Sequence, residues 1–112
     1  MIRFIVLIAA CAACATAPIP NERLASTEAS IRGAQEAGAD AVPQAQLHLK
    51  FATEGIAQAR KLIAERRNEE AGLVLDRARA DAELAVGLSR EAQVKAEAEQ
   101  ALAQVAAIKA NP

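Results

Sequence analysis

The sequence has few of the residues that build β-sheets, nucleotide-binding loops and disulfide frameworks. It contains no Trp or Tyr, two Phe, five Gly, four Pro and two Cys among 112 residues. Thirty residues are Ala, and Glu, Arg and Gln are also frequent. Because these residues lose little conformational freedom in a helix, the composition predicts an all-α protein. It argues against a β-sandwich and against an α/β nucleotide-binding fold.

Net charge is also small. Thirteen Lys and Arg stand against fourteen Asp and Glu, which gives a formal net charge of −1. Proteins that bind nucleic acids usually carry an excess of positive charge to neutralise the phosphates. We therefore expect no nucleic-acid partner.

The first residues have the pattern of an export signal. One cation, Arg3, precedes an uncharged apolar run, and small residues follow around the two cysteines. This run is too short for a transmembrane helix, which needs about 20 apolar residues. Pro18 and Pro20 come directly afterwards and favour extended backbone. The sequence thus predicts a signal peptide over residues 1–13, a tether over 14–20 and an Ala-rich helical domain over 21–110.

The cysteine-containing segments resemble the lipobox of bacterial lipoproteins, in which a cysteine receives diacylglycerol and becomes the mature N-terminus. Ile8-Ala9-Ala10-Cys11 fits the consensus better, but it leaves a leader of only ten residues. Cys14-Ala15-Thr16-Ala17-Pro18 is similar to the opening of a lipoprotein tether. We favour Cys14 as the lipid-attachment residue and keep Cys11 as the alternative. Neither is followed by the Asp that retains such proteins in the inner membrane, so the resemblance implies the periplasmic face of the outer membrane.

Capping signals divide the remaining chain into three helical segments. The first is expected over about residues 21–37, with Asn21 as N-cap and Gly38 just past its end. Pro43 opens the second segment. Basic residues then give way to Asn68-Glu69-Glu70, a charge reversal that predicts a turn with Asn68 as a cap. This turn lacks Gly and Pro, so an uninterrupted helix through Asn68 is the alternative.

The third segment, from about Glu69 to Lys109, has no proline. Its roughly 40 residues extend about 60 Å as a helix, against about 36 Å for the second segment. We therefore expect an antiparallel helical hairpin plus a shorter N-terminal helix, a three-helix bundle-like fold with a long overhanging C-terminal helix. Gly87 is a place where the third segment could bend.

Helical spacing predicts which apolar residues face the core. In the second segment the predicted face comprises Leu47, Phe51, Ile56, Ala59, Leu62 and Ile63. In the third segment it comprises Leu73, Val74, Ala78, Ala85, Leu88 and Ala92. Ion pairs are expected along the third segment for Arg77 with Asp81, Arg79 with Glu83, and Glu91 with Lys95.

Two stretches resemble a family of Ala-rich bacterial lipoprotein domains of unknown function. They are ATEGIAQARKLIA at residues 52–64 and ARADAELA at residues 78–85, with Glu69-Glu70-Ala71 between them. The resemblance implies an export lipobox followed by an antiparallel helical hairpin. Some members also carry an OmpA-like peptidoglycan-binding domain. We expect no such domain in the 112 residues of this sequence, so its activity is not transferred.

The sequence offers little for catalysis or cofactor binding. His48 is the single histidine, and a lone helical His is more often a surface or packed residue than a ligand. The two cysteines have CxxC spacing, but no strand, His or second pair accompanies them, so no metal or other cofactor is expected. We therefore predict that the protein is not an enzyme.

A basic cluster near the turn is the candidate interaction surface: Arg60, Lys61, Arg66 and Arg67. It suits anionic headgroups or cell-wall polymers, although charges at a helix C-terminus also occur for purely structural reasons. The leading hypothesis is a lipid-anchored structural or protein-interaction module of the cell envelope, with an unknown envelope protein or cell-wall partner. The alternatives are a self-associating coiled coil, hence a homo-oligomer, and a small helical ligand carrier or enzyme with a pocket beside His48.

Overall fold

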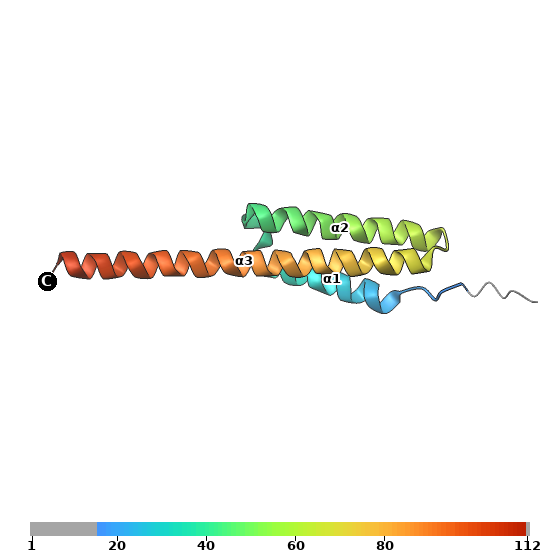
Figure 1. Cartoon of the computed structure of the whole chain (residues 1–112), viewed down its shortest axis with the longest axis horizontal. Coiled ribbons are helices and arrows are strands. Elements are labelled where there is room, and N and C mark those ends of the chain that lie inside the picture. Colours follow the sequence, from blue (N-terminus) through green and yellow to red (C-terminus); the bar gives the residue numbers. More distant parts are fainter. Residues whose placement is uncertain (1–15, 112) are drawn as a thin grey trace, which may run out of the picture.

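The computed structural model describes residues 16–111 and contains three α-helices and one short 3₁₀ turn. The elements are α1 (Asn21–Glu36), η1 (Ala39–Ala41), α2 (Pro43–Ala64) and α3 (Asn68–Ala110), and no strand occurs in these residues. Figure 1 shows α2 antiparallel to α3, with α1 packed along another side of α3. The predicted all-α architecture is confirmed. The predicted signal peptide, Cys11 and Cys14 lie outside the described residues.

The first two predicted helix boundaries are close to those observed. Gly38 has a φ of +82°, the left-handed conformation expected just past a helix end, and its N–H donates to the carbonyl of Gln35 at 2.9 Å. Pro43 is the first residue of α2, where its missing N–H costs nothing. The prediction for Asn21 was wrong by one position, because Pro20 is the N-cap and Asn21 is already helical.

The chain does turn after the basic residues, so the alternative of an uninterrupted helix is excluded. Arg66 adopts a φ of +61°, a position usually occupied by Gly. The N–H of Arg66 donates to the carbonyl of Ile63 at 3.0 Å, and that of Arg67 donates to Leu62 at 2.8 Å. These two bonds form a Schellman motif that satisfies the last carbonyls of α2. Asn68 is not the cap of α3, because Arg67 holds that position.

α3 is one unbroken helix of 43 residues and stays α-helical through Gly87. At 1.5 Å per residue it is about 64 Å long, whereas the 22 residues of α2 extend about 33 Å. The difference appears as a C-terminal overhang, drawn in orange and red in Figure 1. All residues from 93 to 110 are exposed, and we call this segment the arm. The predicted overhang is confirmed.

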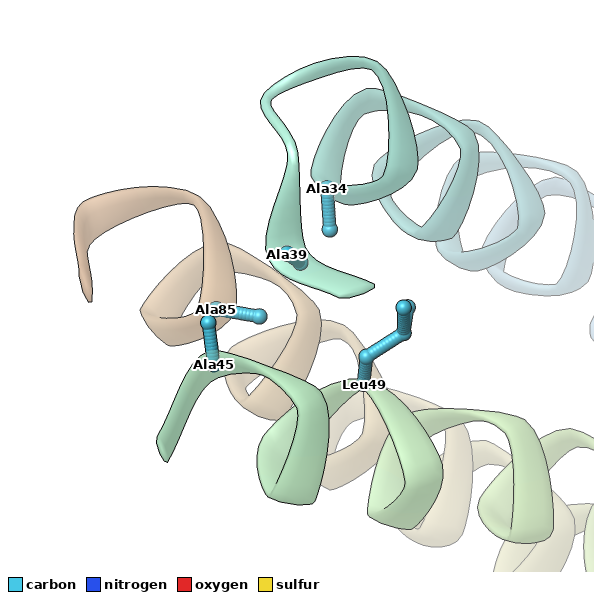
Figure 2. Close-up of a cluster of buried hydrophobic side chains, with 5 residues drawn as sticks. All are labelled: Ala34, Ala39, Ala45, Leu49 and Ala85. Carbon is cyan, nitrogen blue, oxygen red and sulfur yellow. The ribbon is translucent and has the colours of Figure 1, made fainter. Parts of the chain in front are cut away.

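Small side chains form most of the core. Leu75, on α3, is the largest side chain that is completely buried, whereas most of the other core residues are Ala. Figure 2 shows one cluster in which α1, η1, α2 and α3 meet through Ala34, Ala39, Ala45, Leu49 and Ala85. A second cluster surrounds Leu75 and contains Ile56, Ala59, Leu62 and Ala71. Such small residues allow the helix axes to approach closely, which compensates for the shortage of bulky apolar residues.

Part of the predicted core face was wrong. Leu47, Phe51 and Leu73 are 50%, 43% and 65% exposed. The buried residues are found two positions away, at Leu49 and Leu75. Two residues correspond to about 200° around an α-helix, so these side chains point away from the bundle. In both helices Ala residues occupy much of the buried face. A prediction based on the size of the apolar side chains therefore chose the wrong face.

Candidate functional site

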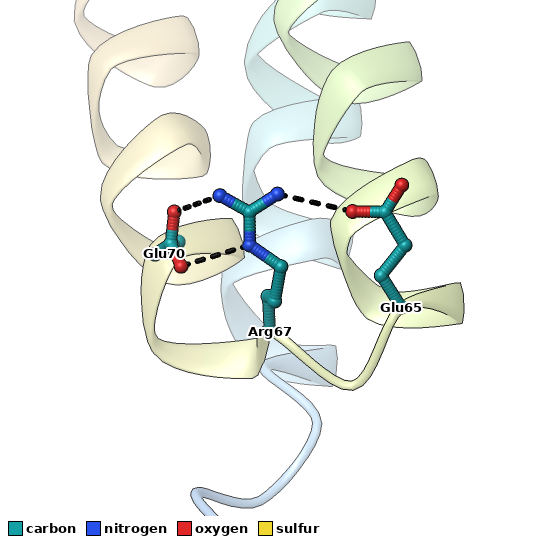
Figure 3. Close-up of polar contacts among 3 residues, drawn as sticks. All are labelled: Glu65, Arg67 and Glu70. Atoms are coloured by element: carbon teal, nitrogen blue, oxygen red, sulfur yellow. Dashed lines mark hydrogen bonds and ion pairs between the residues drawn. The ribbon is translucent and has the colours of Figure 1, made fainter.

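The predicted basic cluster lies at the α2–α3 turn, and Arg67 is bound by acidic neighbours there. Its Nη1 lies 3.1 Å from a carboxylate oxygen of Glu65, and its Nε lies 2.9 Å from one of Glu70 (Figure 3). Nη2 makes a further bond to Glu70, so that contact is bidentate. Hydrogen bonding to the guanidinium lowers the pKa of Glu70, and its carboxylate raises that of Arg67. Arg67 therefore connects the residue at the end of α2 with the first turn of α3.

Arg60 is also engaged within the fold. Its Nη2 lies 2.6 Å from Oε1 of Glu28, so the pair connects α2 to α1 across the surface. Lys61 and Arg66 are exposed, and the described residues show no ion pair for either. Two of the four predicted cations are thus neutralised by carboxylates. Of the four cations, Lys61 and Arg66 keep an exposed positive charge with no carboxylate bound among the described residues.

The tether meets the body at the same turn. The Asn68 side-chain Nδ2 donates to the carbonyl of Ala17 at 2.7 Å, and Asn68 Oδ1 is buried without a partner. Pro18, Ile19 and Pro20 line a groove against the first turn of α3. The segment that follows the predicted lipid-attachment site is therefore held beside the turn. The arm extends from the opposite end of the bundle, as Figure 1 shows.

His48 connects the two long helices. Its Nδ1 lies 2.9 Å from Oδ1 of Asp81 on α3, and its ring packs edge-on against Phe51 with centroids 5.9 Å apart. Asp81 thus pairs with His48 rather than with Arg77 as predicted, whereas the Arg79–Glu83 and Glu91–Lys95 pairs are present. A groove of about 290 Å³ runs beside Asp81 and Phe51, but His48 does not line it. The geometry assigns His48 a structural role.

Large apolar side chains are exposed on the arm. Leu102 and Ile108 are 70% and 72% exposed, and Val94 and Val105 are also solvent-accessible. No other element of the described chain covers this part of α3. Val94, Val105 and Ile108 lie two positions, or about 200° around the helix, from the continuation of the buried series Ala78, Ala82, Ala85 and Ser89. This offset is the sequence signal that they do not belong to the core face.

Within residues 16–111, no group of three or more His, Cys, Asp or Glu side chains is arranged to hold a metal ion. No helix in this part of the chain has the length and hydropathy required to cross a membrane.

The fold defines a class of protein, the all-α three-helix bundle, here with a projecting helical arm. No protein-family model matches the chain, and comparison with curated proteins and with solved structures also found no match. The likeness to Ala-rich lipoprotein domains therefore stays a resemblance.

Proposed function

We propose that this protein is a lipid-anchored structural or protein-interaction module at the periplasmic face of the bacterial outer membrane, and that its arm is the element that contacts partners. The observation that carries the proposal is the arm itself. It extends about 27 Å over eighteen exposed residues and presents apolar side chains that the bundle does not use. Exposed apolar surface of this kind is typical of interaction sites.

The position of the tether supports the same function. Asn68 holds Ala17 beside the turn, so the anchored end and the arm lie at opposite ends of α3. Along α3 the tip of the arm is about 60 Å from the turn. An acyl group attached at Cys14 would hold the turn near the lipid headgroups, with Lys61 and Arg66 exposed beside them. The same arrangement places the arm within reach of partners away from the point of attachment.

Acylation is tested directly by metabolic labelling of the full chain in a bacterial host with radioactive palmitate. We expect label in the wild type, no label in Cys14→Ser, and retained label in Cys11→Ser. The reverse pattern would assign the attachment to Cys11. An unlabelled wild-type chain would refute the anchor.

The role of the arm is tested by a photoreactive amino acid at position 102 of the full chain in the envelope. The photoreactive residue is combined in turn with a second substitution, either Ala98→Glu or Ala96→Glu. These two positions are a matched pair, because both are exposed on the arm and they lie about 200° apart around the helix. We expect an adduct of defined mass that persists in Ala96→Glu and is lost in Ala98→Glu. The absence of any adduct, or an adduct equally strong in both variants, contradicts the assignment of the arm as the contact element.

A further inference from the structure

Residues 16–20, which we call the strap, lie alongside the first turn of α3 before α1 begins. In Figure 1 they are the blue segment at the same end of the bundle as the α2–α3 turn. Among the described residues, one hydrogen bond connects the strap to α3: Nδ2 of Asn68 donates to the carbonyl oxygen of Ala17 at 2.7 Å. The two residues are 51 positions apart in the sequence, so this contact belongs to the tertiary structure. Asn68 therefore determines where the strap meets the body.

The Asn68 side chain does not cap α3, although its residue type suits a cap. An Asn at a helix start usually accepts a hydrogen bond from an N–H of the first turn. Here Arg67 is the N-cap without a side-chain cap bond, and Asn68 Oδ1 is buried with no partner among residues 16–111. The amide instead directs its NH₂ group, the only part that can donate, at the strap. The contact with Ala17 thus accounts for this side chain better than helix capping does.

The strap is held only weakly. Thr16 and Pro18 are exposed, and Ile19 is 52% exposed. A groove of about 380 Å³ is lined by both the strap and the first turn of α3, so the two are not closely packed there. One neutral hydrogen bond adds little net stability, and the unpaired Asn68 Oδ1 opposes it. Fixing the backbone of the strap also costs conformational entropy. Neither core cluster contains a strap residue, so the body does not depend on the strap for its packing.

We propose that the strap is releasable, that Asn68 is the residue that holds it, and that its release sets how far the body stands from the lipid anchor. The inference rests on the proposed function, with the lipid at Cys14. A chain spans at most about 3.5 Å per residue, so a held Ala17 lies within about 10 Å of Cys14. After release the first fixed residue is Asn21, where α1 begins, and the reach rises to about 24 Å. The gain of about 14 Å is the same if Cys11 carries the lipid.

Release has two consequences for the proposed envelope module. A held strap keeps the α2–α3 turn, with the exposed Lys61 and Arg66, beside the point of attachment. A released strap lets the body rotate and move away from the lipid, so the arm reaches partners at a greater distance from the membrane. Asn68 acts through the strap, as a positioning residue, and does not itself contact the partner.

A nitroxide attached to Cys14 tests the hold in residues 14–112, which contain no other cysteine. The core clusters and ion pairs described above lie within residues 16–111, so a chain that begins at residue 14 or 16 retains them. Asn68→Asp removes the donor, because an ionised carboxylate only accepts hydrogen bonds. An acidic side chain is favourable in the first turn of a helix, so this substitution does not weaken α3. The same substitution at Asn111, just past the other end of α3, is the matched control.

We expect the nitroxide to broaden the amide NMR signals of residues 66–72 in the wild type and in Asn111→Asp. In Asn68→Asp most of this broadening should be lost. On warming, the wild type should lose the broadening before far-UV circular dichroism reports unfolding of the helices, because the strap opens locally. A wild type without broadening, equal broadening in the wild type and Asn68→Asp, or broadening that persists until the helices unfold would each overturn the proposal.

The reach is measured by neutron reflectometry on a supported bilayer that contains a maleimide lipid, to which Cys14 of residues 14–112 is coupled. We expect the body of Asn68→Asp to stand up to about 14 Å farther from the bilayer than that of the wild type, and Asn111→Asp to match the wild type. Equal heights for all three chains would refute the control of reach by Asn68. Chemical coupling replaces acylation here, so a chain that incorporates no palmitate would refute the proposed anchor and leave these outcomes unchanged.

Discussion

The close contact between α2 and α3 at Gly55 leads to a sharp test of the packing. A Cβ atom placed on Gly55 would lie 2.6 Å from the Cβ of Ala78, well inside the 3.4–4 Å of ordinary contact. α2 would have to move by about 1 Å away from α3 at this point. Gly87, in the exposed part of α3, has nothing within 4 Å of the corresponding position. The same substitution, Gly→Ala, therefore meets opposite environments at the two sites.

The two effects have opposite signs. Replacing a helical Gly by Ala stabilises a protein by about 0.5–1 kcal/mol because the unfolded chain loses freedom. At Gly87 no steric cost opposes this gain in stability. At Gly55 overpacking costs about 1–3 kcal/mol and outweighs it. We expect the two variants to differ by about 2 kcal/mol, which corresponds to about 8–16 °C in melting temperature for a domain of this size.

Thermal unfolding followed by far-UV circular dichroism measures the difference, with dilute residues 16–112 so that self-association does not contribute. We expect Gly87→Ala to melt above the wild type and Gly55→Ala below it. If Gly55→Ala melted at or above Gly87→Ala, the reasoning that small residues set the spacing of α2 and α3 would be refuted.

Three further predictions concern the core and the turn. Leu75→Ala should cost about 2–5 kcal/mol in urea unfolding because Leu75 is fully buried, whereas Leu73→Ala, at an exposed position, should cost less than about 0.5; similar losses would contradict the observed helix face. Arg66→Gly should raise stability by about 0.5–1 kcal/mol, since Arg66 has a positive φ, and a loss would refute the strain argument. Arg67 lowers the pKa of Glu70 below 4.5, so its contribution is present above that pH and disappears as the pH falls through the folded-state pKa. Glu70→Gln should therefore reduce the loss of stability between about pH 6 and pH 3, and an unchanged pH dependence would exclude this role.

Several features of the fold follow from local chemistry alone. The Ala-rich composition predicts helices, and Gly38 and Pro43 mark two boundaries because their backbone preferences act within one or two residues. The overhang follows from simple lengths, since an uninterrupted helical segment longer than its partner must extend past it. The turn follows from charge reversal, although its Schellman geometry at Arg66 does not, because few sequences without Gly adopt it.

The sequence by itself determined that this chain is helical, where the helices turn and that the last one extends beyond the others, because propensities, caps and helix lengths are local properties. Only the tertiary structure decided which face of each helix is buried, that Arg60 binds Glu28 of another helix, and that the tether returns to Asn68. In a core built from Ala, bulky residues can lie on either side of a helix. Which side is buried depends on how closely the backbones approach, and that distance is a property of three helices together.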